Sequence, residues 1–449
     1  MAILILLIDH NKHDLDYIVD EVKRELISVS DNIESIIYKL SWHYTIVINM
    51  LRRKYPESPL QAFQVCTDKD KLVYDFLKEI DSPSILSMTI TDLFLSFVKL
   101  VKLKASVSVS DYKADLEISS PQQNTKTFGS ILKRTESFIQ NHLREVIGGD
   151  KLYILIDDLD IDWNPYSQTQ QKLMSALFSA VNVYLNEPHI KPIVALRTDI
   201  FKGLQVHQRE KYGDLILKVE WNEELLRDFL KKRISKVYQD ISVSDIDTKF
   251  FEGNIDGEDP IKYMIGYTLD RPRDLLELCK LAIKEASSKK ANLISEVHIK
   301  DALDEYSLNR VIALEDEWKL LHSNLEKLIK LIARFSTHEQ ISDGYSPVSF
   351  HETLNRIRSY LLGVNKSNDS EPMWFLEKYG ESESTPQDIV STLYDLGIIY
   401  LVNEGRLSKQ ASDSRMPRII TTTTIKIHPM FSRYMALMID EDKSPWLSN

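Results

Sequence analysis

Two hydrophobic runs, each followed at once by charged residues, constrain the fold of this chain most strongly. Residues 152–160 read LYILIDDLD and residues 191–199 read KPIVALRTD, and the helical pattern of residues 167–187 lies between them. Short, continuous aliphatic runs are typical of strands that are buried on both faces of a parallel sheet. The alternation of strands and helices therefore predicts an α/β unit with parallel strands.

Further elements of this unit are expected upstream. Residues 3–8 (ILILLI) predict another buried strand, and residues 14–56 and 90–104 have helical patterns. The polar, serine-rich stretch 105–127 predicts a loop. The apolar positions of residues 130–147 fall on one face of a helix that leads into the next strand.

The pattern changes to helices alone after residue 220 and changes again near residue 315. In the last part, three helical patterns precede two strand-like runs, an order that indicates a winged-helix module. We therefore expect a core at residues 1–215, a helical lid at 216–312 and a winged-helix domain at 313–449. The helical patterns after residue 220 cover residues 221–238, 263–269, 271–286, 294–311, 315–335, 349–362 and 386–396.

Composition agrees with a soluble protein of several domains. The 449 residues exceed the size at which one core keeps growing. Lys and Arg number 56 against 67 Asp and Glu, and the net charge of −11 argues against binding of nucleic acid or anionic membrane by the whole surface. No run approaches the roughly 18 apolar residues of a membrane helix. The two cysteines, Cys66 and Cys279, are too few for a disulfide framework, and we expect buried thiols and a cytoplasmic location.

Carboxylates and a guanidinium follow the two strands that constrain the fold. Asp157 and Asp158 lie at the carboxyl end of the first strand, with Asp160 a turn further on, and Arg197 and Asp199 end the second run. Ligands of open α/β sheets bind just outside the carboxyl ends of the strands. Adjacent carboxylates there suit Mg²⁺ and the activation of water, while Arg197 suits a terminal phosphate. An ordinary acidic loop, or a salt bridge from Arg197 to an aspartate, would explain the same residues.

The segment LDRPRDLL carries a second hint of phosphate. Pro272 suits the first turn of a helix, but Arg271 and Arg273 place cations at the end where the helix dipole favours anions. A bound phosphate would remove this conflict. An ion pair with Asp270 or Asp274 is the alternative, and from this segment alone it is the preferred one.

These motifs, in this order, resemble the bacterial P-loop ATPases of the AAA+-related STAND and KAP-like type over roughly residues 130–440. The resemblance implies a parallel-sheet P-loop NTPase-like core, a helical lid and a winged helix, with ATP and Mg²⁺ as cofactors. It implies that Asp157 is the Walker B aspartate that binds Mg²⁺, and that Asp158 polarises the attacking water. It further implies that Arg197 acts as a sensor-1 arginine and Arg273 as a sensor-2 arginine, with Pro272 near the base. Members of this type act as nucleotide-driven switches, many of them in defence against phage, and as oligomers or with protein partners.

The sequence departs from this family in one essential segment. None of its 13 glycines belongs to a GxxxxGK[ST] loop, the motif whose backbone N–H groups and lysine hold the phosphates. The chain opens where the second strand of the family's core is expected, so the first strand and the phosphate loop are expected to be missing. ATP hydrolysis is therefore uncertain and depends on a loop supplied from elsewhere. A pseudo-ATPase that serves as an interaction scaffold is the first alternative.

A winged-helix regulator that binds DNA is the other alternative. The expected recognition helix contains Asp388 and Asp395 but no lysine or arginine, so it would repel phosphate. Protein docking is therefore preferred to DNA. Basic residues that could still reach a DNA backbone lie in the expected wing: Arg406, Lys409, Arg415 and Arg418.

Other chemistries have no support. The segment that begins at His351 lacks the second histidine of HExxH, and His10 and His13 suit a solvated turn better than a metal site. The sequence contains no GxSxG elbow and no GxGxxG fingerprint.

Overall fold

The structure is a computed structural model of the 449-residue chain. The chain divides into two compact units, residues 1–216 and residues 217–449. The described residues are 2–7, 31–54, 67–68, 71–72, 75, 133, 135–147, 151–157, 159, 167–197, 200–201, 204, 213–319, 321–364, 371–379, 387–408 and 416–442.

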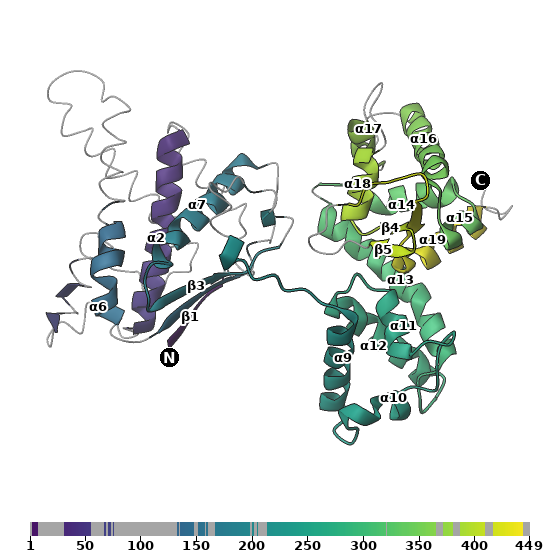
Figure 1. The fold of residues 1–449 in the computed structure, drawn as a ribbon, viewed down its shortest axis with the longest axis horizontal. Helices are drawn as coiled ribbons and strands as arrows, with labels where there is room; N and C mark the ends of the chain where they lie inside the picture. The colour runs from purple at the N-terminus through teal and green to yellow at the C-terminus, as the bar shows by residue number, and fades with distance from the viewer. Residues whose placement is uncertain are drawn as a thin grey trace. The chain divides into compact units, whose positions relative to one another are not determined.

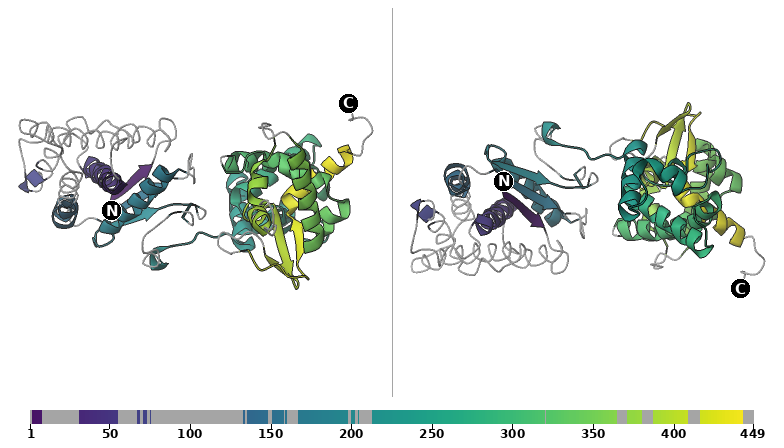
Figure 2. Two further views of the ribbon diagram at one scale, coloured as in Figure 1. Left: turned by 90° about the horizontal axis from the view of Figure 1, so that it is seen from above. Right: turned by 90° about the horizontal axis from the view of Figure 1, so that it is seen from below.

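A parallel sheet, of which three strands lie within the described residues, organises the N-terminal unit. The strands β1 (Ala2–Leu7), β2 (Leu152–Asp157) and β3 (Ile190–Val194) lie in the order β1-β2-β3. Both pairs are parallel, as the aliphatic runs predict. Figure 2 shows the strands side by side, with β2 in the centre. The central strand therefore carries the first acidic residue of the predicted site to the middle of one sheet edge.

In the described part of this unit, the sheet is accompanied by the helices α2 (Asp31–Lys54), α6 (Leu143–Ile147) and α7 (Gln168–Tyr184) (Figure 1). They share one hydrophobic core with the buried face of β2, which carries Ile154 and Ile156. The α2–α7 contact includes a hydrogen bond from Trp42 Nε1 to the Leu173 carbonyl at 3.0 Å. The N-terminus of α7 is capped by Ser167, whose hydroxyl accepts from Gln170 N.

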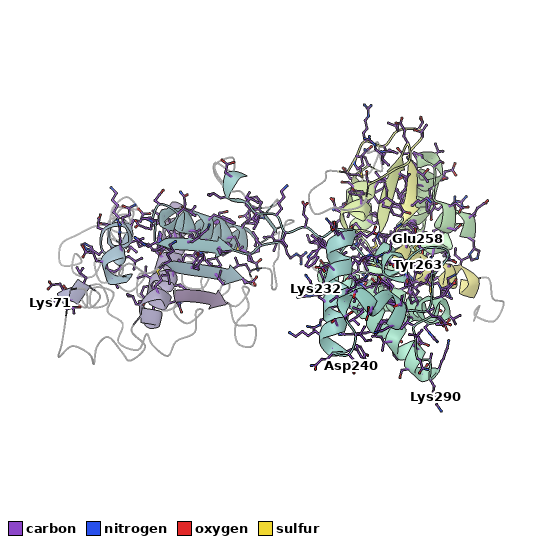
Figure 3. All side chains as sticks on the ribbon, turned by 60° about the horizontal axis from the view of Figure 1, so that its bottom comes forward. Lys71, Lys232, Asp240, Glu258, Tyr263 and Lys290 are labelled. Carbon is purple, nitrogen blue, oxygen red and sulfur yellow. The ribbon has the colours of Figure 1, made fainter. Side chains whose placement is uncertain are left out.

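Helices alone form the first part of the C-terminal unit, as the sequence predicts. Asn222 caps the first of them, with its side chain accepting from Leu225 N at 2.8 Å, and Asp259 caps α11 through Lys262 N. At the surface of this part lie Lys232 on α9 and Lys290 beyond α12 (Figure 3). The elements are α9 (Glu223–Val237), η4 (Val243–Asp245), α10 (Ile246–Lys249), α11 (Pro260–Gly266), α12 (Pro272–Ser288) and α13 (Glu296–Trp318).

Helices and a small antiparallel sheet form the second part of this unit. The sheet has the strand order β5-β4-β6, and Tyr345 adds an isolated antiparallel bridge to Ile425. The elements are α14 (Leu325–Arg334), α15 (His338–Asp343), α16 (Pro347–Gly363), α17 (Trp374–Tyr379), α18 (Gln387–Asp395), β4 (Ile399–Asn403), β5 (Arg406–Ser408), β6 (Thr424–Ile427) and α19 (Pro429–Asp442).

One continuous hydrophobic core joins the two parts of the C-terminal unit. The expected boundary at residues 312 and 313 falls inside α13, which packs against both α12 and α19. Ser307 on α13 donates to the Met430 carbonyl at 2.7 Å and accepts from Tyr434 N at 3.1 Å. Because these contacts are buried, the predicted lid and the predicted winged helix are one packed body in this structure.

Several predicted elements lie outside the described residues. They are the helical pattern at 90–104, the serine-rich stretch at 105–127 and the first part of the pattern at 14–56. The assignment of the sheet to a P-loop core stays a prediction.

Candidate functional site

Asp157 is the last residue of the central strand β2, and its side chain is exposed. It is paired in register with Leu7 of β1. On the other side, Ala195 N donates to the Ile156 carbonyl at 2.8 Å and extends the pairing one residue beyond β3. A carboxylate thus stands at the carboxyl edge of a parallel sheet, where ligands of α/β proteins bind. Asp158 and Asp160 lie outside the described residues.

Arg197 lies two residues beyond that last backbone contact and is half-buried. Its carbonyl accepts from Phe201 N at 3.1 Å, so the chain turns immediately after the strand. The register places Arg197 at the same edge of the sheet as Asp157. Asp199, predicted at this edge, is outside the described residues.

The described residues place one predicted metal-binding carboxylate, that of Asp157, at this edge of the sheet. Within the described part of the chain, no group of three or more His, Cys, Asp or Glu side chains is arranged to hold a metal. Mg²⁺ is usually held by one or two carboxylates, and water and substrate phosphates complete its octahedron. The exposed Asp157 carboxylate meets this requirement.

The start of α12 keeps the cationic character that the sequence indicates. Pro272 occupies the first turn, and Arg271 stands at the N-cap without a side-chain capping bond. Arg271 pairs with Glu317 of α13 at 3.1 Å, a partner that the sequence reasoning missed. Arg273 is exposed and makes no hydrogen bond or ion pair with a described residue. The predicted sensor-like arginine is therefore accessible.

A buried ion pair lies one residue further along the helix. The Asp274 carboxylate, 1% exposed, is 3.2 Å from Arg310 Nη1 on α13, and Glu277 is 3.6 Å from the same atom. Burial raises the pKa of the Asp274 carboxyl, and the Arg310 guanidinium opposes that shift. The sequence analysis predicted Asp274 as an alternative ion-pair partner of Arg271 or Arg273, but the structure pairs Asp274 with Arg310. The sequence does hold a signal for a partly buried Arg310. It lies four residues after Tyr306 and four before Leu314, and both of these are buried, so Arg310 falls within the apolar stripe of α13.

Two of the four basic residues that were expected to lie in a wing are within the described residues. Arg406 on β5 and Arg418 are exposed, whereas Lys409 and Arg415 lie outside the described ranges. Helix α18, which was the expected recognition helix, contains Asp388 and Asp395 and no lysine or arginine that could contact a DNA phosphate. His351 is exposed on α16, and His10 and His13 are not described.

A buried imidazole was missed by the sequence reasoning. His322 is 5% exposed, and its ring centroid lies 4.4 Å from that of Trp374 and 6.2 Å from that of Trp318. Burial lowers its pKa to about 4, and the charge of Lys378 adds to the effect. This histidine is neutral at physiological pH and belongs to the packing of the C-terminal unit.

Residues 224–315 match the family described as the FunZ-associated C-terminal helical domain. In the structure this region runs from α9 into α13 and contains only helices and their connections. The chain is also 24% identical, over 332 residues, to a protein of Escherichia coli (strain K12) described as "Putative transposon gamma-delta 80.3 kDa protein". The match covers 72% of this chain and 43% of the relative, so the chain spans less than half of the relative's length.

No solved structure matches the chain. No helix among the described residues has both the length and the hydropathy needed to cross a membrane. Neither of the two matches is described as a P-loop, STAND or KAP-like ATPase, so that resemblance stays a prediction. What the comparisons show is that residues 224–315 of this chain are similar to the FunZ-associated C-terminal helical domain.

Proposed function

We propose that the N-terminal unit is the α/β core of a nucleotide-dependent switch of the ATPase type. The observation that carries this proposal is the parallel sheet, which places the exposed Asp157 at the end of its central strand. Arg197 follows the neighbouring strand at the same edge. An anionic and a cationic side chain at one carboxyl edge suit the two parts of a magnesium–nucleotide complex.

In this proposal Asp157 binds Mg²⁺, and the cation supplies the charge that neutralises the phosphates of ATP. Asp158 polarises the attacking water. Arg197 donates to a terminal phosphate oxygen, since a guanidinium forms strong charge-assisted hydrogen bonds to phosphate. The sequence has no GxxxxGK[ST] loop, so in this proposal another segment of the chain supplies the backbone contacts to the triphosphate.

In the C-terminal unit we propose that Arg273 contacts an anion at the start of α12. The first turn of a helix exposes backbone N–H groups and the positive end of the dipole. Pro272 fixes that turn, and Arg271 is already paired with Glu317. Arg273 is then the cation of this segment that an anionic ligand can reach.

Equilibrium binding of ATP to the full chain, with Mg²⁺ and with EDTA, tests the metal role. We expect Mg²⁺ to tighten binding, and Asp157→Ala to weaken it about tenfold in Mg²⁺ while leaving binding in EDTA unchanged. Lys191→Ala is the matched control, because Lys191 is an exposed residue of β3 away from the carboxyl edge. Absence of binding, or equal affinities of the wild type and Asp157→Ala in Mg²⁺, would contradict the proposal.

Arg197 is tested in the same assay with a pair of nucleotides. Arg197→Ala should weaken the binding of ATP more than the binding of ADP, because the lost contact is to the terminal phosphate of ATP. Arg197→Lys should recover part of the difference, since lysine keeps the charge but not the forked geometry. Equal losses for ATP and ADP would remove Arg197 from this role.

DNA binding through the wing is a second candidate function. The exposed Arg406 and Arg418 favour it, and the name of the Escherichia coli relative associates that protein with a transposon. A phosphate contact of this kind predicts affinity that falls steeply with added salt, with a smaller salt dependence in Arg418→Ala. Affinity that is unchanged in Arg406→Ala and Arg418→Ala would argue against the wing.

A further inference from the structure

A buried histidine lies in the core of the N-terminal unit, between α2 and α7. The His43 side chain on α2 is 0% exposed. Its Nδ1 atom lies 3.3 Å from the Tyr184 hydroxyl of α7, which can either donate or accept. Its Nε2 atom makes no hydrogen bond with a described residue. A single polar contact therefore holds this imidazole among the apolar side chains of the core.

A carboxylate close to His43 is already paired with a lysine. Glu136 belongs to the helical residues 135–141, and its Oε1 atom is 4.0 Å from His43 Nε2, too far for a hydrogen bond. The same oxygen accepts from Lys39 Nζ at 2.6 Å. A proton on His43 would thus lie near the Lys39 cation as well as near the carboxylate. Because these two charges largely cancel, they do not offset the cost of a buried imidazolium.

The elements β1 and α7, against which α2 packs, supply no anion to the ring. The strand β1 reads AILILL and has no ionisable side chain, and those of α7 are Lys172 and Tyr184. Lys172 is paired with Glu34 of α2 at 2.8 Å. Burial raises the pKa of the Tyr184 hydroxyl, which stays neutral. The neutral ring is therefore the form of His43 that fits this place in the core.

We propose that His43 is a proton-sensitive latch: uptake of one proton by its ring opens the packing of α2 against α7. Desolvation, together with the Lys39 charge, lowers the pKa of His43 to about 3, whereas a solvated histidine has a pKa of about 6.5. A group with a lowered folded pKa stabilises the fold above its unfolded pKa and loses that contribution as pH falls toward the folded value. The latch therefore weakens from about pH 6.5 downwards. It is independent of the nucleotide binding proposed above.

Hydrogen–deuterium exchange of the full chain at pH 7.5 and pH 5.5, corrected for the intrinsic exchange rate at each pH, tests the latch. We expect the opening constant of the α2 amides around His43 to rise about tenfold between the two values, since the ring is protonated only when it is exposed. His43→Asn cannot take up the proton, so its opening constant should change by less than about twofold. A tenfold rise in this variant as well would overturn the proposal.

His142→Asn is the matched control, because it removes another histidine of the same unit. His142 directly follows the helical residues 135–141 and is exposed, so its ring is solvated whether α2 is closed or open. This variant should keep the rise of about tenfold. A rise that disappears in His142→Asn would overturn the proposal, because the acid effect would then come from an exposed ring.

Titration of the wild-type protein covers the case in which His43→Asn does not fold. The ring signals of ¹³C-labelled histidines are followed by NMR from pH 7.5 to pH 5.5. Tyr184→Phe identifies the His43 signal, because it removes the hydroxyl that contacts Nδ1. We expect the His43 signal to stay at its neutral position over this range. A His43 signal that titrates with a midpoint of about pH 6.5 would overturn the proposal.

Discussion

The two units of the chain use their charged side chains in different ways. In the C-terminal unit, Asp274 and Arg310 meet inside the protein, between two packed helices. In the N-terminal unit, Asp157 stands exposed at the end of a strand. A buried pair fixes the structure around it, because removing one partner leaves an uncompensated charge. An exposed carboxylate contributes less to folding and can be reached by a ligand, so we expect substitutions in the two units to differ in their cost to stability.

Arg310→Met should have the largest effect on stability. It leaves the Asp274 carboxylate buried without its cation, and we expect a loss of about 3–5 kcal/mol in urea unfolding of the C-terminal unit. The double variant Asp274→Asn, Arg310→Met should recover most of the loss, because no buried charge remains. Recovery that does not occur would show that Arg310 acts through packing of its stem.

The same variant has a predicted pH dependence. Burial already raises the pKa of Asp274, and loss of Arg310 raises it further. A carboxyl whose pKa is higher in the folded than in the unfolded protein loses stability as pH rises through that interval. Arg310→Met should therefore be less destabilised, relative to the wild type, at pH 5 than at pH 8, as measured by urea unfolding at both values.

Gly344→Ala should have the next largest effect. Gly344 has φ +101°, and an added Cβ would lie 2.8 Å from side-chain atoms of Thr424 and Lys426 and 2.9 Å from the Ile425 carbonyl. Backbone strain and the close approach to β6 together predict a loss of about 3 kcal/mol. Gly266→Ala, in α11 with open space around it, should change stability by less than about 1 kcal/mol. Equal effects of the two changes would contradict the tight contact at Gly344.

His322 should make the C-terminal unit sensitive to acid. Burial lowers its pKa to about 4, below the value of about 6.5 in an unfolded chain. A group with a lowered folded pKa contributes stability above the unfolded pKa and loses it as pH falls toward the folded one. We expect a loss of about 2 kcal/mol between pH 7 and pH 4.5 that His322→Phe reduces. An unchanged pH profile in that variant would mean that other groups cause the acid sensitivity.

Asp157→Ala should have the smallest effect on stability. The side chain is exposed at the end of β2, so thermal unfolding should differ from the wild type by no more than about 0.5 kcal/mol. This result would sharpen the contrast with Arg310. A loss above about 2 kcal/mol would instead place Asp157 among the residues that hold the fold.

The strands were predictable because each aliphatic run is short, continuous and bounded by charge. The ends of the strands were harder to predict. The strand β2 was expected to reach residue 160 and ends at Asp157, and β3 was expected to reach residue 199 and ends at Val194. Arg197, the described charged residue after the second run, lies where the chain turns, since its carbonyl accepts from Phe201 N. Helix α13 runs to Trp318, seven residues beyond the expected end, because Leu314 joins the core that α13 shares with α14 and α19.

The candidate site was predicted in part. The place of Asp157 at the end of a strand could be predicted, because a strand and its first charged residue are local features; its role in binding a metal stays a prediction. Arg310 and Glu317 were missed, because their roles depend on how α12 and α13 pack, and a charged residue on a helix is usually solvated. For the same reason the sequence offered Asp270 or Asp274 to Arg271, whereas the structure pairs Arg271 with Glu317.

We propose that the carboxyl edge of the parallel sheet binds a metal–nucleotide complex. Fe²⁺ substituted for Mg²⁺ cleaves the backbone near its site when peroxide is added, so the cut positions locate the ion directly. We predict ATP-dependent cuts close to residues 157 and 197 that disappear in Asp157→Ala. Cuts elsewhere, or cuts at this edge that need neither ATP nor the Asp157 carboxylate, would contradict the claim.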